Sequence, residues 1–172
     1  IHDTGAGNDG IFLRSVSNVR IENCDIYNIE GQGGIRLSIS GTGTHGVVIT
    51  GNRIHDVQMN GINAPQRSQA DPPVAQDSLV IEGNTIYNTG LVSSDGLHHA
   101  IYCQAPYARI EGNVIYGERD GNGISMRSSG LISGNTVSGW SKADKPCIRY
   151  YSDHMAGASN LLVIENNMVW ND

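Results

Sequence analysis

The side chains best suited to acid–base chemistry lie in the second half of this sequence. Two adjacent histidines, His98 and His99, come shortly before Tyr102, and arginines follow at positions 127 and 149. An arginine can neutralise a carboxylate through a two-pronged hydrogen bond, after which a base can remove a proton from the neighbouring carbon. We therefore assign His99, or its neighbour His98, as candidate base, Tyr102 as candidate acid or proton shuttle, and Arg127 as candidate neutralising group.

Further polar residues are candidates for contacting the same substrate. If the site is catalytic, Arg127→Ala is expected to abolish turnover and leave the fold intact, because a residue that faces outward from a strand adds little to the core. The same residue types would also form a polar stripe, with arginine stacked on tyrosine, that only keeps the surface soluble. Both interpretations stay open for the candidate binding residues, which are Gln104, Ser125, Arg149, Tyr151, His98 and His154.

A repeat positions these residues. The string "IEGNTIY" from Ile81 returns as "IEGNVIY" from Ile110, and related strings begin at Ile21, Ile49, Ile132 and Ile164. Their first residues are separated by 28, 32, 29, 22 and 32 positions. Between the copies lies a second motif, for example "GIRLS" and "GISMR". Apolar and polar residues alternate within both motifs, which predicts short strands.

A repeat of this length predicts a solenoid of stacked coils. A propeller blade needs about 40 residues, and the leucine framework of a horseshoe is missing. Coils of short strands would stack at about 4.8 Å as parallel sheets. An asparagine recurs at one position of the unit and should form a hydrogen-bonded ladder inside a turn. The sequence therefore predicts an all-β parallel solenoid of about six coils, with an asparagine ladder at Asn52, Asn84, Asn113, Asn135 and Asn167.

The second motif predicts where a ligand would bind. Its isoleucine and the residue two positions later should point inward, so that the alternate residues form an outward column. The long segments 65–78 and 151–159 should wall a cleft over the nearly loop-free fourth and fifth coils. The expected floor of this cleft contains Tyr102, Gln104, Ser125 and Arg127, with Arg149 and Tyr151 toward one wall.

The repeats resemble those of the right-handed parallel β-helices of the pectate-lyase-like superfamily, over nearly the whole chain. This resemblance implies a right-handed coil and a polysaccharide partner, with lyase- or epimerase-like chemistry on a uronic-acid-containing glycan. It also implies an extracellular or cell-surface location in a bacterium or phage. Non-catalytic glycan-binding or structural modules share the fold, and fold does not select among them. The polygalacturonase strings "NTD", "GHG" and "RIK", and the epimerase string "DPH", are absent from the sequence.

Composition restricts the partners. The net charge of −6 and the lack of a Lys/Arg cluster argue against nucleic acid, and no apolar run is long enough to span a membrane. A neutral glycan suits this charge as well as an acidic one does. We assign no cofactor and no metal site, because Asp95, Asp120, Asp144 and Asp153 are isolated and expected to be solvated; Ca²⁺ would suit such a chain, but no spaced acidic motif marks a site for it.

Cysteines and chain ends complete the expectations. Cys103 and Cys147 fall two coils apart, about 9 Å or more, which is too far for a disulfide, so three free and largely buried thiols are expected. Residues 1–172 should form a single domain and a piece of a longer solenoid, since the pattern shows no capping segment at either end. Uncapped coils would favour self-association, end to end or side by side.

Overall fold

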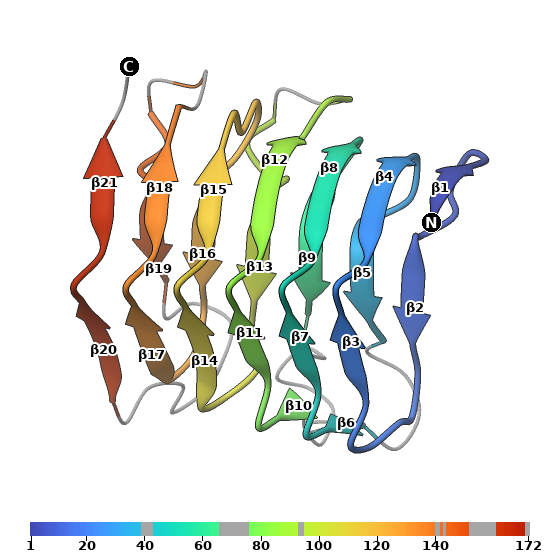
Figure 1. Ribbon diagram of the computed structural model, residues 1–172. Coiled ribbons are helices and arrows are strands. Elements are labelled where there is room, and N and C mark those ends of the chain that lie inside the picture. The colour runs from blue at the N-terminus through green and yellow to red at the C-terminus, as the bar shows by residue number, and fades with distance from the viewer. Residues whose placement is uncertain are drawn as a thin grey trace.

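The computed structural model describes residues 1–38, 43–65, 76–92, 95–139, 142, 144–151 and 161–170. Its strands wind into a stack of coils with the N-terminal and C-terminal strands at opposite ends (Figure 1). Every strand pair is parallel, and each coil contributes one strand to each of three long sheets. The predicted all-β parallel solenoid is confirmed. No helix in the described part of the chain is long and apolar enough to cross a membrane.

The three long sheets are named here by their first strands. Sheet 1 has seven described strands and sheets 2 and 3 have six each. Sheet 1 contains β1 (His2–Thr4), β4 (Asp25–Ile29), β8 (Arg53–Val57), β12 (Thr85–Thr89), β15 (Val114–Tyr116), β18 (Thr136–Ser138) and β21 (Met168–Trp170). Sheet 2 contains β2 (Ile11–Leu13), β5 (Gly33–Leu37), β9 (Asn60–Ala64), β13 (Ile101–Cys103), β16 (Ile124–Met126) and β19 (Ile148–Tyr150). Sheet 3 contains β3 (Arg20–Glu22), β7 (Val48–Thr50), β11 (Val80–Glu82), β14 (Ala108–Glu111), β17 (Gly130–Ser133) and β20 (Leu162–Glu165). A short pair, β6 (Thr44–His45) and β10 (Gln76–Asp77), lies beside them.

The core consists of isoleucine columns that run along the stack. In sheet 2, for example, Ile62, Ile101 and Ile124 are in register on adjacent strands, and all three are fully buried. Equivalent positions align in sheets 1 and 3. Because successive residues of a strand point to opposite sides, the residue that follows each of these isoleucines along its strand faces outward. Each copy of the sequence repeat therefore adds one residue to each of these core columns.

The predicted asparagine ladder is present at the turn between sheets 3 and 1. Asn113 Oδ1 accepts hydrogen bonds from the backbone N–H and the side-chain amide of Asn84, at 2.9 and 3.0 Å. Its own amide donates to Ile81 O and to Asn135 Oδ1. The pattern repeats from Asn52 to Asn167, and the backbone N–H of Cys24 donates to Asn52 Oδ1 at the first coil. Each side chain thus satisfies backbone groups that the turn leaves unpaired.

A second ladder lies on the outer side of sheet 1. The rings of His2, Tyr27, His55, Tyr87 and Tyr116 stack face to face, with centroids 4.6 to 5.1 Å apart. Since each ring covers the face of the next, little aromatic face remains for a ligand. We interpret this column as stabilising the stack of coils.

The three cysteines are unpaired, as predicted. Cys103 is buried in the core, and burial raises the pKa of its thiol to about 12. It therefore remains protonated and acts as a small apolar side chain. Cys24 and Cys147 are only half-buried, so the expectation of buried thiols is met fully by Cys103 alone.

Candidate functional site

A groove with a volume of about 590 Å³ crosses the outer side of sheet 2. The register of the sheet aligns Phe12, Arg36, Asn63 and Tyr102 on consecutive strands, as the predicted outward column requires. These four residues line the groove together with residues of the connecting loops and of the next column. The other lining residues are Gln32, Leu37, Ser38, Met59, Asn60, Pro65, Leu97, His98, His99 and Arg127.

The groove lies nearer the N-terminus than the predicted cleft. Ser125 aligns with Tyr102 and Arg149, but it is wholly buried, and Gln104 is 6% exposed. A short serine between two long side chains of the same column is easily covered. Neither residue lines the groove, and Arg149 and Tyr151 also lie outside its lining. The groove therefore differs from the expected cleft at two floor positions, Gln104 and Ser125, and at the two residues expected toward a wall, Arg149 and Tyr151.

Few residues of the two expected cleft walls belong to the part of the chain that the structure describes. Most of segment 65–78 and of segment 151–159 lies outside the described residues. His154, one of the candidate binding residues, lies outside them as well. Pro65, at the start of the first segment, lines the groove.

Arg127 is packed between aromatic rings. Its guanidinium carbon lies 4.0 Å from the ring centroid of Tyr151 and 5.5 Å from that of Tyr102. The guanidinium carbon of Arg149 lies 4.3 Å from the same Tyr151 centroid. Arg127 is only 8% exposed. The premise that Arg127 faces solvent is wrong, so Arg127→Ala is now expected to lower stability by removing this buried packing. The stacked arrangement is the one anticipated for a structural stripe.

The groove contains a second arginine that the sequence assignment omitted. Arg36 Nε lies 2.7 Å from Asp9 Oδ2, its Nη1 donates to Gln32 Oε1, and its guanidinium lies 4.6 Å from the Phe12 ring centroid. Asn60 and Asn63, also omitted, each donate toward Gln32 O. The signal for Arg36 and Asn63 was available, since both belong to the outward column of Tyr102. The sequence did not show where along this column the groove lies.

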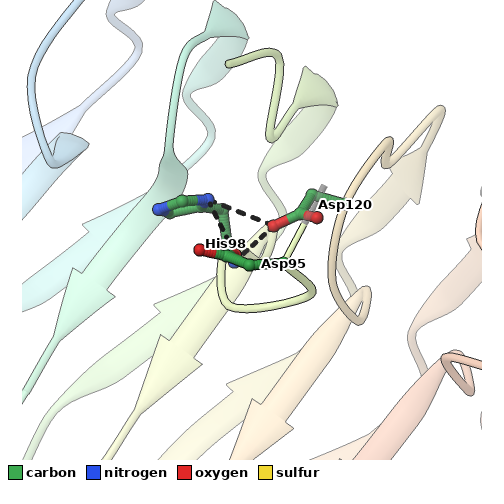
Figure 2. Close-up of side chains that lie close together, drawn as sticks. All are labelled: Asp95, His98 and Asp120. Carbon is green, nitrogen blue, oxygen red and sulfur yellow. Dashed lines mark hydrogen bonds and ion pairs between the residues drawn. The ribbon is translucent and has the colours of Figure 1, made fainter. Parts of the chain in front are cut away.

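His98 is oriented by a buried carboxylate. Its Nδ1 lies 3.1 Å from Asp120 Oδ2 and 3.8 Å from Asp95 Oδ1, while the other end of the ring points away from both acids (Figure 2). Asp120 is wholly buried and accepts the backbone N–H groups of Gly96, Leu97 and His98. Burial alone would raise the pKa of Asp120, but these hydrogen bonds and nearby positive charge lower it overall, so the carboxylate is ionised. The expectation that Asp120 is a solvated loop residue is wrong.

Asp95, His98 and Asp120 have ligand atoms within 4.8 Å of one another, a spacing that would suit a metal ion. However, the Asp120 oxygens already face four N–H donors, and Lys142 Nζ lies 3.6 Å away. These donors occupy the directions in which a cation would bind. We interpret the cluster as a hydrogen-bonded carboxylate–histidine pair.

His99 is held as a hydrogen-bond donor. Its Nδ1 accepts the backbone N–H of Asn122 at 2.8 Å, so the proton of the neutral ring is on Nε2. Burial, followed by the positive charge of Arg127, lowers the pKa of His99 to about 3. The ring stacks on Tyr102 with centroids 5.6 Å apart. This bonding does not suit the base role expected of His99, because protonation of Nδ1 would break the bond to Asn122.

A buried glutamate lies on the same loop as Asp120. Glu118 accepts the Thr89 hydroxyl at one oxygen and backbone N–H groups of residues 119–121 at the other. Burial outweighs these bonds and raises its pKa from the ordinary value of 4.5 to about 7. Between about pH 4.5 and about pH 7, the Glu118 carboxyl group therefore keeps its proton in the folded chain but has lost it in the unfolded chain.

The free energy of unfolding is expected to fall as the pH rises through this window. A shift of this size corresponds to about 3 kcal/mol lost between about pH 5 and about pH 8. Glu118→Gln should remove most of this slope, since the amide does not ionise, its oxygen can accept the backbone N–H groups and its NH2 group can donate to the Thr89 hydroxyl oxygen. Denaturant unfolding of the parent protein and of Glu118→Gln, each at about pH 5 and about pH 8, measures the effect. Equal slopes would show that Glu118 is not the group responsible.

Comparison with known proteins identifies the fold family. A family model described as "Right handed beta helix region" matches residues 1–171. Searches of curated proteins and of solved structures each gave no significant match. The match supports the right-handed coil, while membership of the pectate-lyase-like superfamily stays a prediction. Because the model covers almost the whole chain, this chain belongs to the family of right-handed β-helix regions.

Proposed function

We propose that this β-helix domain binds a polysaccharide in the groove on sheet 2. The observation that carries the proposal is the composition of the groove along successive coils. Phe12, which is 46% exposed, and the half-buried Tyr102 bring aromatic rings to the groove lining, and Arg36, Asn60 and Asn63 bring guanidinium and amide groups to it. Sugars are recognised by this combination of ring stacking and amide or guanidinium hydrogen bonds. Such a domain would act outside the cell or at a bacterial or phage surface.

A uronic-acid-containing glycan is the proposed substrate class. Arg36 has five N–H donors, and its contacts with Asp9 and Gln32 leave some of them for a ligand. Arg127 adds a second positive charge at the other end of the groove lining. Local positive charge in a groove can attract an acidic sugar to a protein of net negative charge. Lyase- or epimerase-like proton abstraction is the reaction that suits this substrate class.

Binding without chemistry is the second candidate. The packing of Arg127 between Tyr102 and Tyr151 and the pairing of Arg36 with Asp9 favour it, because both arginines are committed to the protein before a ligand arrives. A non-catalytic module would retain the polysaccharide and leave it unchanged.

Replacing Phe12 with alanine is expected to weaken polysaccharide binding about tenfold. Loss of one stacked ring removes about 1 to 2 kcal/mol of contact energy. Binding to immobilised pectate, alginate, glycosaminoglycans and a neutral glucan measures it. Tyr107→Ala is the matched control, because Tyr107 is an exposed ring, at 64%, outside the groove lining. Equal affinities for the Phe12 variant and the parent protein, or an equal loss in the control, would contradict the assignment of the groove.

A further inference from the structure

The two adjacent histidines are held in opposite protonation patterns. Asp120 Oδ2 can only accept, so in the neutral ring of His98 the proton is on Nδ1 and Nε2 carries a lone pair. Asn122 N–H can only donate, so in His99 the lone pair is on Nδ1 and the proton is on Nε2. The same ring atom is therefore an acceptor in one histidine and a donor in the next.

The surroundings fix this arrangement firmly. Asp120, which orients His98, is itself held by three backbone N–H groups. The backbone N–H of His99 donates to Asn60 Oδ1 at 2.8 Å, which ties the pair to the groove. Side chains held in this way by a second layer of hydrogen bonds lose little freedom when a ligand binds.

The Nε2 atoms of both histidines belong to side chains that line the groove, with His98 half-buried and His99 2% exposed. His98 and His99 line the groove, and among the described residues neither Nε2 makes a hydrogen bond. A lone pair and an N–H group therefore meet the groove from neighbouring residues of one loop.

We propose that this pair is a proton-abstraction site, in which His98 Nε2 is the base and His99 Nε2–H stabilises the oxygen that gains charge. The inference rests on the proposed binding of a uronate-containing glycan in the groove. Asp120 acts as a positioning residue, since it contacts His98 and not the substrate.

The proposed step requires no co-reactant. The C–H bond next to the uronate carboxyl group breaks, the proton goes to His98 Nε2, and the electron pair moves toward the carboxyl carbon to give an enediolate. His99 Nε2–H donates to one of its oxygens. A proton then returns to the carbon. If it comes from solvent to the same face, hydrogen is exchanged; if it arrives at the opposite face, the centre is inverted. Alternatively, the electron pair expels the glycosidic oxygen of the next carbon, which takes the proton from His98 and leaves an unsaturated uronate.

Solvent exchange tests this step directly. The protein is incubated in D₂O with polygalacturonate, alginate or hyaluronan, and NMR follows deuterium at the carbon next to the carboxyl group while absorbance follows unsaturated ends. His98→Gln is expected to lower the rate about 100-fold or more, and His99→Gln about 100-fold, with glycan retention kept in both. Asp120→Asn should lower the rate while retention persists. His2→Gln, the same change on sheet 1, should leave the rate unchanged.

The outcomes separate the two proposals. Retention without any deuterium uptake or unsaturated ends by the parent protein would overturn the catalytic pair and leave the binding function standing. Absence of retention as well would contradict the binding function itself. Full activity in His98→Gln, or activity abolished by a chelator, would also overturn the pair, the latter by assigning the cluster to a metal ion. Nitrogen chemical shifts of the parent protein check the arrangement without any variant: Nδ1–H for His98 and Nε2–H for His99 are expected, and the reverse pattern would overturn it.

Discussion

Replacing Asn113 with alanine is expected to lower the free energy of unfolding by about 3 to 5 kcal/mol. Asn113 is wholly buried and takes part in four hydrogen bonds of the ladder through its side chain. Alanine would leave the Asn84 donors, Ile81 O and Asn135 Oδ1 without these partners. Each buried polar group that loses its partner costs about 1 to 3 kcal/mol, partly recovered where the turn relaxes. Urea unfolding followed by circular dichroism measures the change.

Asn167→Ala is the matched control for this ladder. Asn167 occupies the same position of the repeat, but it lies at the end of the column and is only partly buried. Water can replace its bonds more readily, so about 1 kcal/mol is expected. Equal losses for Asn113→Ala and Asn167→Ala would contradict a ladder whose strength depends on burial.

Alanine at position 121 is expected to displace the histidine pair. An added Cβ at Gly121 would lie 2.1 Å from His98 O and 2.2 Å from His99 Nδ1, both far inside van der Waals contact. The loop must then move, which costs about 1 to 3 kcal/mol of stability. The move also breaks the bond between His99 Nδ1 and Asn122 N–H, on which the donor state of His99 depends.

The same NMR and unfolding measurements test the Gly121 variant. Loss of the Nε2–H pattern of His99, together with lower stability, is the expected result. Gly5→Ala is the control, because an added Cβ there would meet its nearest atom at 3.9 Å. An unchanged His99 spectrum in Gly121→Ala would show that the loop does not rely on this close approach.

The stack of coils could be predicted from the sequence because residues at equivalent positions of the repeat are direct neighbours on adjacent coils. Ile81 and Ile110, at the same letter of the repeat, are direct neighbours on β11 and β14, and Asn84 and Asn113 bond to each other. Each coil repeats the environment of the previous one, so residues that align in the sequence repeat also contact each other in the structure. The outward column of Phe12, Arg36, Asn63 and Tyr102 followed from the same alternation.

The site could be predicted only in part because it depends on loops outside the repeat. The doublet at 98–99 was recognised, but the roles within it depend on whether each Nδ1 meets Asp120 or Asn122, which no spacing encodes. Burial of Ser125 and the stacking of Arg127 likewise depend on long neighbouring side chains. Residue type indicated which chemistry was available, and the loop conformation decides where it is used.

A crystal structure with a bound uronate oligosaccharide is the most direct test of the central claim that the groove on sheet 2 is the binding site. The expected result is a sugar chain lying across the strands at Phe12 and Tyr102, with a carboxylate near Arg36 and His98 Nε2 facing a ring carbon. A sugar chain bound instead on the outer side of sheet 1, along the column of Tyr27, Tyr87 and Tyr116, would contradict it.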